Sequence, residues 1–167
     1  MTKIRLESVV IFLSILFCTG VVRADAGSWI VGSAAVRNEA GQNLYGERLA
    51  VFLVREKSPV SAEKCLAETH PQRQMDCLNN RHLDFYKQFQ QNQQQPGYLI
   101  DQTETSETGN FAFLNAPVGT FYILIKFPSM IDGYKVAWQE PVTVTSGRIS
   151  VVTLNEDNLV LPKNRRR

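Results

Sequence analysis

Apolar and polar residues alternate over several short stretches of this chain, which is the pattern of β-strands. Turns rich in Gly, Asn and Ser separate most of the stretches. The pattern shows none of the regularly repeated crossover helices that join the strands of a parallel sheet. The alternation covers Trp29 to Arg37, Arg48 to Arg55, Tyr98 to Thr105, Phe111 to Leu114, Phe121 to Phe127, Val136 to Val144 and Ile149 to Leu154. This pattern predicts a mainly β fold, a seven-stranded antiparallel β-sandwich.

Between residues 58 and 95 the spacing of apolar residues changes to that of helices. Ser58-Pro59 is a good N-cap followed by proline at the first helical position, and His70-Pro71 ends the helix that starts there. From about Gln72 onward, one helical face carries Met75, Leu78, His82, Phe85, Tyr86 and Phe89. The sequence therefore predicts a helical hairpin, residues 58–95, inserted between two strands of the sandwich.

The first 26 residues have the three parts of a signal peptide. Lys3 and Arg5 precede an apolar run, and Ala24-Asp25-Ala26 is an A-x-A cleavage pattern. The apolar stretch has about 14 residues, whereas a membrane-spanning helix needs about 20. We therefore expect cleavage, export to the periplasm or the medium, and no membrane span in the mature chain. Residues 27–157 would form the sandwich, and the basic residues 158–167 a solvated C-terminal tail.

Cysteine usage agrees with an exported protein. Removal of Cys18 with the signal peptide leaves Cys65 and Cys77 in a compartment where disulfides persist, so we predict that they pair. A zinc site is the alternative, because His70 and His82 fall in the same window. Residues five apart on a helix point about 140° from each other, and there is no C-x2-C knuckle, so the spacing favours the disulfide.

One part of the chain resembles a known family. The stretch TETSETGNFAFLNAPVGTFYILIKF, Thr103 to Phe127, resembles the core motif of the carboxypeptidase regulatory-like domain, an Ig-like and transthyretin-like β-sandwich. Ile30-Val31-Gly32 with Glu39-Ala40-Gly41 resembles that family's first strand and turn, and Val142 to Leu154 resembles its closing hairpin. The resemblance implies the same sandwich, from which the helical insertion is a departure.

Composition and residue inventory narrow the function. Lys plus Arg is 18 against 16 for Asp plus Glu, so the chain has no positive excess for holding nucleic acid. Neither histidine is followed by a Glu at metalloprotease spacing, and the chain ends without the Tyr-Arg-Gly-Ser of the transthyretin-like hydrolases. We expect no enzymatic activity, cofactor or metal. The expected function is a protein-interaction or assembly module of the periplasm or cell envelope.

Two sets of residues are candidates for contacts with a partner. In an Ig-like order the second and fifth strands are neighbours, so their outward side chains would form one apolar patch, covered by the inserted helices or by an envelope or secreted protein: Phe52, Val54, Tyr122 and Leu124. Tyr134 and Trp138 either stack on a sugar or pack the end of the sandwich. The architecture resembles starch-binding-like sandwiches, so the alternative function is a carbohydrate-binding module with a glycan as partner.

Overall fold

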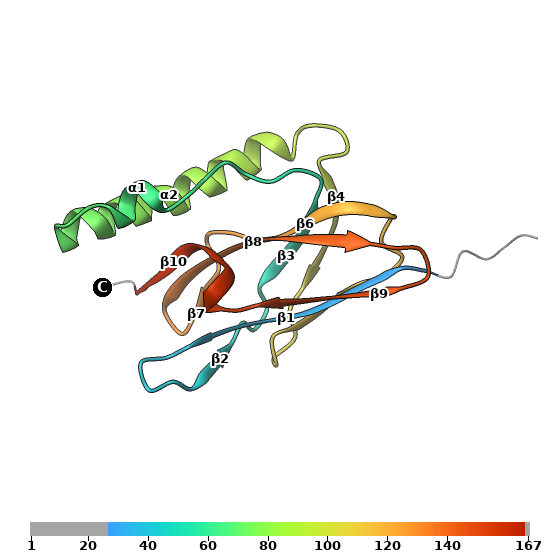
Figure 1. Ribbon diagram of the computed structural model, residues 1–167, viewed down its shortest axis with the longest axis horizontal. Coiled ribbons are helices and arrows are strands. Elements are labelled where there is room, and N and C mark those ends of the chain that lie inside the picture. The colour runs from blue at the N-terminus through green and yellow to red at the C-terminus, as the bar shows by residue number, and fades with distance from the viewer. Residues whose placement is uncertain (1–26, 166–167) are drawn as a thin grey trace, which may run out of the picture.

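A computed structural model describes residues 27–165, as two β-sheets packed face to face with a long helix along the outer side of the larger sheet (Figure 1). The predicted signal peptide lies outside the described residues, and its cleavage stays a prediction. A mainly β sandwich with a helical insertion is the fold class that the hydrophobic pattern predicts, and the structure confirms it.

The larger sheet has six strands in the order β10-β8-β6-β3-β4, with the short β7 paired to β8. Every pairing in it is antiparallel. The strands are β3 (Ala50–Val54), β4 (Leu99–Glu104), β6 (Gly119–Ile125), β7 (Met130–Ile131), β8 (Tyr134–Val144) and β10 (Leu159–Arg165).

The smaller sheet is built around β1 (Trp29–Arg37). Its antiparallel neighbours are β5 (Asn110–Phe113) and the short β2 (Asn43–Tyr45), whereas β9 (Ile149–Leu154) runs parallel to it. This parallel pair differs from the all-antiparallel plan that we expected. A tight turn, in which Arg148 N donates to Thr145 O, joins β8 to β9. The chain crosses from the larger to the smaller sheet at this turn, and β9 then runs beside β1 in the same direction.

Alternate residues of both sheets fill the space between them. Phe111 and Phe113 of β5 lie edge to face with ring centroids 6.1 Å apart. Gly32 gives the Phe111 ring its room, since a β-carbon there would collide with that ring and lie 2.6 Å from the carbonyl oxygen of Val152. The largest fully buried side chains of this core are Trp138, Phe113, Ile30, Leu53, Ile123, Ile125, Leu154 and Val36.

The inserted region holds two helices of very unequal length, α1 (Glu63–Leu66) and α2 (Pro71–Asn92). The prediction is right for α2 and wrong for the extent of the first helix. Ser58 caps no helix: its hydroxyl donates to Gln88 Oε1 and its backbone N donates to Gln139 Oε1, which ties the segment before α1 to α2 and β8. The Cys65–Cys77 disulfide is confirmed and joins α1 to α2. Neither of the two described helices is long and apolar enough to cross a membrane.

The apolar face of α2 packs on the outer side of the six-stranded sheet. Leu78, Phe85 and Phe89 are buried there, and the sheet side chains that meet them are Val54, Leu124, Ala137 and Leu161. The ammonium of Lys126, at the end of β6, lies 4.7 to 5.0 Å from the ring centroids of Phe52, Tyr86 and Phe89. These cation–π contacts hold a largely buried lysine between helix and sheet, and burial lowers its pKa.

The C-terminal segment is not the solvated tail that its basic residues suggest. Residues 159–165 form β10, which pairs antiparallel with β8. Leu161 is fully buried beneath α2. The apolar run Leu159-Val160-Leu161 is sufficient to extend the sheet, and the sandwich therefore continues beyond residue 157.

If α2 is part of the core, shortening its buried side chains should destabilise the whole protein. We expect Phe85→Ala to lower the free energy of unfolding by about 3 to 5 kcal/mol, the usual loss for a buried aromatic. The control Leu83→Ala, on the exposed side of the same helix, should change it by about 0.5 kcal/mol or less. Urea unfolding of both variants measures the difference, and equally small losses would show that the helix is only peripheral.

Candidate functional site

The apolar patch predicted on the second and fifth strands is internal. Strands β3 and β6 are neighbours, with Phe52 opposite Leu124 and Val54 opposite Tyr122. Val54 and Leu124 are fully buried, and the Phe52 ring lies 4.6 Å from that of Phe89 in α2. The inserted helix therefore covers the patch, which is one of the two alternatives left open by the sequence, and no partner is needed there.

Tyr134 and Trp138 are also packed inside the protein. Trp138 is fully buried in the core between the sheets, and its indole Nε1 donates to Asn155 O at 2.7 Å. Tyr134 is 7% exposed, and the Lys163 ammonium lies 5.1 Å from its ring centroid. Neither ring offers a free face for stacking on a sugar, so packing, the other alternative, describes both residues.

A group of exposed apolar side chains lies instead on the outer face of the four-stranded sheet. Trp29 pairs with Ile149, and Val31 pairs with Val151 on one side and Ala112 on the other. Val151 is 75% exposed, Ile149 62% and Trp29 44%. We call Trp29, Val31, Ala112, Ile149 and Val151 the apolar face. It continues toward Ser33, Asn110 and Thr153 as a shallow hollow of about 400 Å³.

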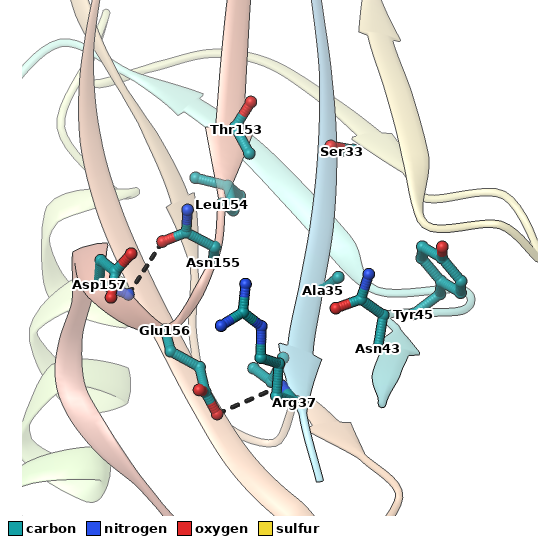
Figure 2. A pocket seen from close by; sticks show the side chains of 11 residues that line it. Ser33, Ala35, Arg37, Asn43, Tyr45, Thr153, Leu154, Asn155, Glu156 and Asp157 are labelled. Carbon is teal, nitrogen blue, oxygen red and sulfur yellow. Dashed lines mark hydrogen bonds between the residues drawn. The ribbon is translucent and has the colours of Figure 1, made fainter. Parts of the chain in front are cut away.

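Polar groups gather at the other end of the same face. There β1, β2 and the short 3-10 helix η1 (Glu156–Asn158) surround a pocket of about 270 Å³. Figure 2 shows the Arg37 guanidinium, the amides of Asn43 and Asn155 and the ring of Tyr45 around this space. Tyr45 is 53% exposed, so its ring is open to a ligand. We call this space the polar pocket.

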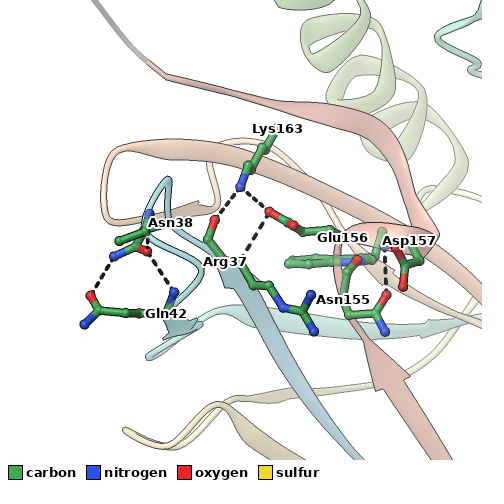
Figure 3. A network of polar contacts seen from close by, with 9 residues as sticks. Arg37, Asn38, Gln42, Asn155, Glu156, Asp157 and Lys163 are labelled. Carbon is green, nitrogen blue, oxygen red and sulfur yellow. Dashed lines mark hydrogen bonds and ion pairs between the residues drawn. The ribbon is translucent and has the colours of Figure 1, made fainter.

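A hydrogen-bond network fixes one wall of the polar pocket (Figure 3). The Glu156 carboxylate accepts from the Lys163 ammonium and from the backbone N of Arg37, and Lys163 also donates to Arg37 O. The hydrogen bond from Lys163 is the main reason that the pKa of Glu156 lies below its ordinary value. The network joins β10, η1 and β1, so the end of the chain helps to shape the pocket.

Asn155 sets the position of η1 in that wall. Its side-chain Oδ1 accepts from Asp157 N at 2.9 Å, while its own backbone N donates to Asn158 Oδ1 at 2.8 Å, which is a capping box. Within residues 27–165, neither the Arg37 guanidinium nor the Asp157 carboxylate forms an ion pair. The pocket thus offers hydrogen-bond donors, acceptors and an aromatic face to a polar ligand.

His82, a member of the zinc alternative, lies on the buried face of α2 and not in a metal site. It is 1% exposed, and neither ring nitrogen has a hydrogen-bond partner in the described part of the chain. Burial lowers its pKa to about 4, and the positive charge of Lys135 adds to the effect. Cys65 and Cys77 form the disulfide and so have no free thiol to bind a metal. Over residues 27–165, no three His, Cys, Asp or Glu side chains lie close enough together to bind a metal ion.

The sequence matches no family model and no curated protein, so the resemblance to the carboxypeptidase regulatory-like domain stays a prediction. Solved structures to which this chain is similar include a "putative carbohydrate binding protein" of Pseudomonas aeruginosa, 17% identical, covering 78% of this chain and 89% of that one with a TM-score of 0.43. The minor pilin of Streptococcus agalactiae is 10% identical, with coverages of 86% and 48% and a TM-score of 0.46. The pilus backbone protein of Streptococcus pneumoniae is 12% identical, with coverages of 75% and 40% and a TM-score of 0.32.

The burial of His82 predicts a loss of stability in mild acid. The pKa of His82 is about 4 in the folded protein against an ordinary value of 6.5, so between these values the unfolded chain binds more protons. The stability present above pH 6.5 should therefore fall by about 3 kcal/mol as the pH drops to 4. His82→Leu should remove most of this loss in urea unfolding at a series of pH values.

The exposed His70 supplies the matched control for that experiment. His70→Leu should keep the full dependence on pH, because it changes an exposed side chain and leaves the buried His82 in place. An equal slope in the His82→Leu protein and the unchanged protein would contradict the assignment.

Proposed function

We propose that this protein is a non-enzymatic exported module that binds a protein partner through the apolar face of its four-stranded sheet. The observation that carries the proposal is the difference between the two outer faces of the sandwich. Helix α2 covers the outer face of the six-stranded sheet, whereas Trp29, Ile149 and Val151 on the other sheet are exposed. The disulfide and the signal-like N-terminus support export.

The make-up of this surface fits a protein interface. Protein interfaces commonly have an apolar centre, rich in aromatic and large aliphatic side chains, and a polar rim. Here Trp29, Ile149 and Val151 give the apolar part, and the polar pocket with Arg37 and Asp157 gives a polar end. Covering a large exposed apolar side chain contributes about 1.5 to 3 kcal/mol, so several are needed to offset the loss of free motion on association.

The positions of the titratable groups support a binding role over a catalytic one. His82 is on the buried face of α2, and His70 is at the start of that helix, on the six-stranded side of the sandwich. In the polar pocket the Glu156 carboxylate is engaged by Lys163. The remaining polar side chains around the pocket carry amides, a guanidinium, a phenol, the hydroxyls of Ser33 and Thr153 and the Asp157 carboxylate, with no imidazole or thiol among them. This set suits recognition by hydrogen bonds.

The polar pocket favours a second candidate function, binding of a saccharide. Tyr45 presents an exposed ring beside the amides of Asn43 and Asn155, and sugar rings combine an apolar face with hydroxyl groups. We therefore propose Tyr45, in place of Tyr134 and Trp138, as the stacking residue of the sugar-binding alternative. In a protein with both functions, the apolar end of the face would bind the protein partner and the polar end the sugar.

A photo-crosslinking amino acid at position 151 tests the protein-binding proposal in the compartment to which the protein is exported. We expect covalent adducts with protein at position 151. The control position is Leu66 in α1, which is also exposed but lies on the other side of the molecule and should give none. Absence of adducts at 151, or the same adducts at both positions, would refute the proposal.

A glycan array tests the saccharide candidate. Binding to a glycan should be lost in Tyr45→Ala, with a drop in affinity of about tenfold or more for the loss of one stacking ring. It should be kept in Val151→Lys, which changes only the apolar end. Failure of the unchanged protein to bind any saccharide would remove this second function and leave the protein-binding proposal intact.

A further inference from the structure

We infer that the partner on the apolar face is a second copy of this chain, docked face to face about a twofold axis that runs parallel to β1 and β9. The inference rests on the proposed function and names its partner. It follows from the register of these two strands and from the distribution of charge at one end of the face.

The parallel register places residues of the same chemical kind next to each other on β1 and β9. Trp29 lies level with Ile149, Val31 with Val151 and Ser33 with Thr153. Each level therefore holds residues of the same kind on both strands: apolar at the first two levels and hydroxyl-bearing at the third. An antiparallel pair would have put the apolar start of one strand level with the polar end of the other.

A twofold axis along the strands exchanges β1 and β9 and keeps every level in place. Trp29 then faces Ile149 of the partner subunit, and Val31 faces Val151 of the partner subunit. Each of these contacts occurs twice, as in any isologous interface. Two sheets stacked in this way lie about 10 Å apart and bring like with like along the whole face.

Charge complementarity selects this arrangement over others. Arg37 ends β1, and Asp157 follows β9 in η1 at the same end of the face, where both line the polar pocket. The Glu156 carboxylate pairs with Lys163 and is also attracted by the Arg37 charge, but among the described residues neither Arg37 nor Asp157 forms an ion pair. The twofold axis sets Arg37 opposite Asp157 of the partner subunit. An axis across the strands would set these charges against the apolar end.

The size of the face predicts a weak and reversible dimer. With strands about 4.8 Å apart and about 3.3 Å per residue, the two strands that this axis superposes, β1 and β9, present roughly 300 Å² of flat surface in each copy. Two such faces lie below the lower limit of about 1,000 to 1,200 Å² for stable specific complexes. Dissociation is therefore expected in the micromolar range or weaker, and the test must cover a wide range of concentrations.

Sedimentation equilibrium of the purified exported protein tests the association. The unchanged protein should pass reversibly from monomer to dimer as its concentration rises. Val151→Lys should weaken the dimer tenfold or more, because it places an ammonium group against the apolar face of the partner. Leu66→Lys, an equally drastic change at an exposed position of α1, should leave the dissociation constant unchanged.

Two charge reversals test the twofold geometry itself. Arg37→Asp and Asp157→Arg should each weaken the homodimer, since each sets like charges against each other twice. An equimolar mixture of the two variants should form a heterodimer as tight as the original, because each cross-contact is then between opposite charges. Circular dichroism and urea unfolding of each variant check that the monomer remains folded.

The outcomes separate this inference from the proposed function. If the unchanged protein stays monomeric at every concentration while position 151 still crosslinks to another protein, the self-docking inference is wrong and the proposed function stands. If neither dimer nor crosslink forms, both are wrong. A dimer that resists Val151→Lys, or a mixture of charge variants no tighter than its components, overturns the twofold arrangement.

Discussion

The packing of α2 on the outer face of the six-stranded sheet is the contact on which the rest of the structure depends. Strands β3 and β6 are apolar on both sides: Leu53 and Ile123 point into the sandwich, while Val54 and Leu124 point away from it. A sheet of this kind is stable only when both faces are covered. Phe85 and its neighbours in α2 cover the second face. The disulfide ties α2 to α1, and the Lys126 ammonium contacts the ring of Phe89 in α2.

Because α2 occupies one side of the sandwich, the two outer faces differ in how far their apolar side chains are exposed. The smaller sheet has no helix over it among the described residues, and its outer side chains Trp29, Ile149 and Val151 are exposed. The chain's last strand strengthens this difference, since β10 packs beneath α2 with Leu161 and joins the polar pocket through Lys163. The face available for binding is therefore the one that the insertion leaves open, with an apolar end and a polar end.

Local signals in the sequence were sufficient for seven of the strands, the long helix and the disulfide, because alternation, helical periodicity and cysteine parity act over short distances, but they missed the short β2 and β7 and the strand β10. They were insufficient where the exposure of a residue depends on pairing between distant segments of the chain. The pairing of β9 with β1 joins segments more than a hundred residues apart. The sequence alone therefore could not show that Val151 is exposed while its neighbour Val152 is buried. Similarly, the basic residues near the C-terminus led to the prediction of a solvated tail, although the apolar run that ends at Leu161 forms a buried strand. The core position of Trp138 depends on a hydrogen bond from its indole to the backbone carbonyl of Asn155, which is distant in the sequence.

Hydroxyl-radical footprinting of the aromatic side chains measures the central claim, that one face is closed by the chain itself and the other is open for a partner. In dilute purified protein, Trp29 and Tyr45 should be oxidised readily, while Trp138 and Tyr98 should be protected. Inside the compartment to which we propose that the protein is exported, Trp29 should become protected as well. The account would be contradicted by a Trp29 that stays equally reactive in both settings, or by a readily oxidised Phe85 on the buried face of α2.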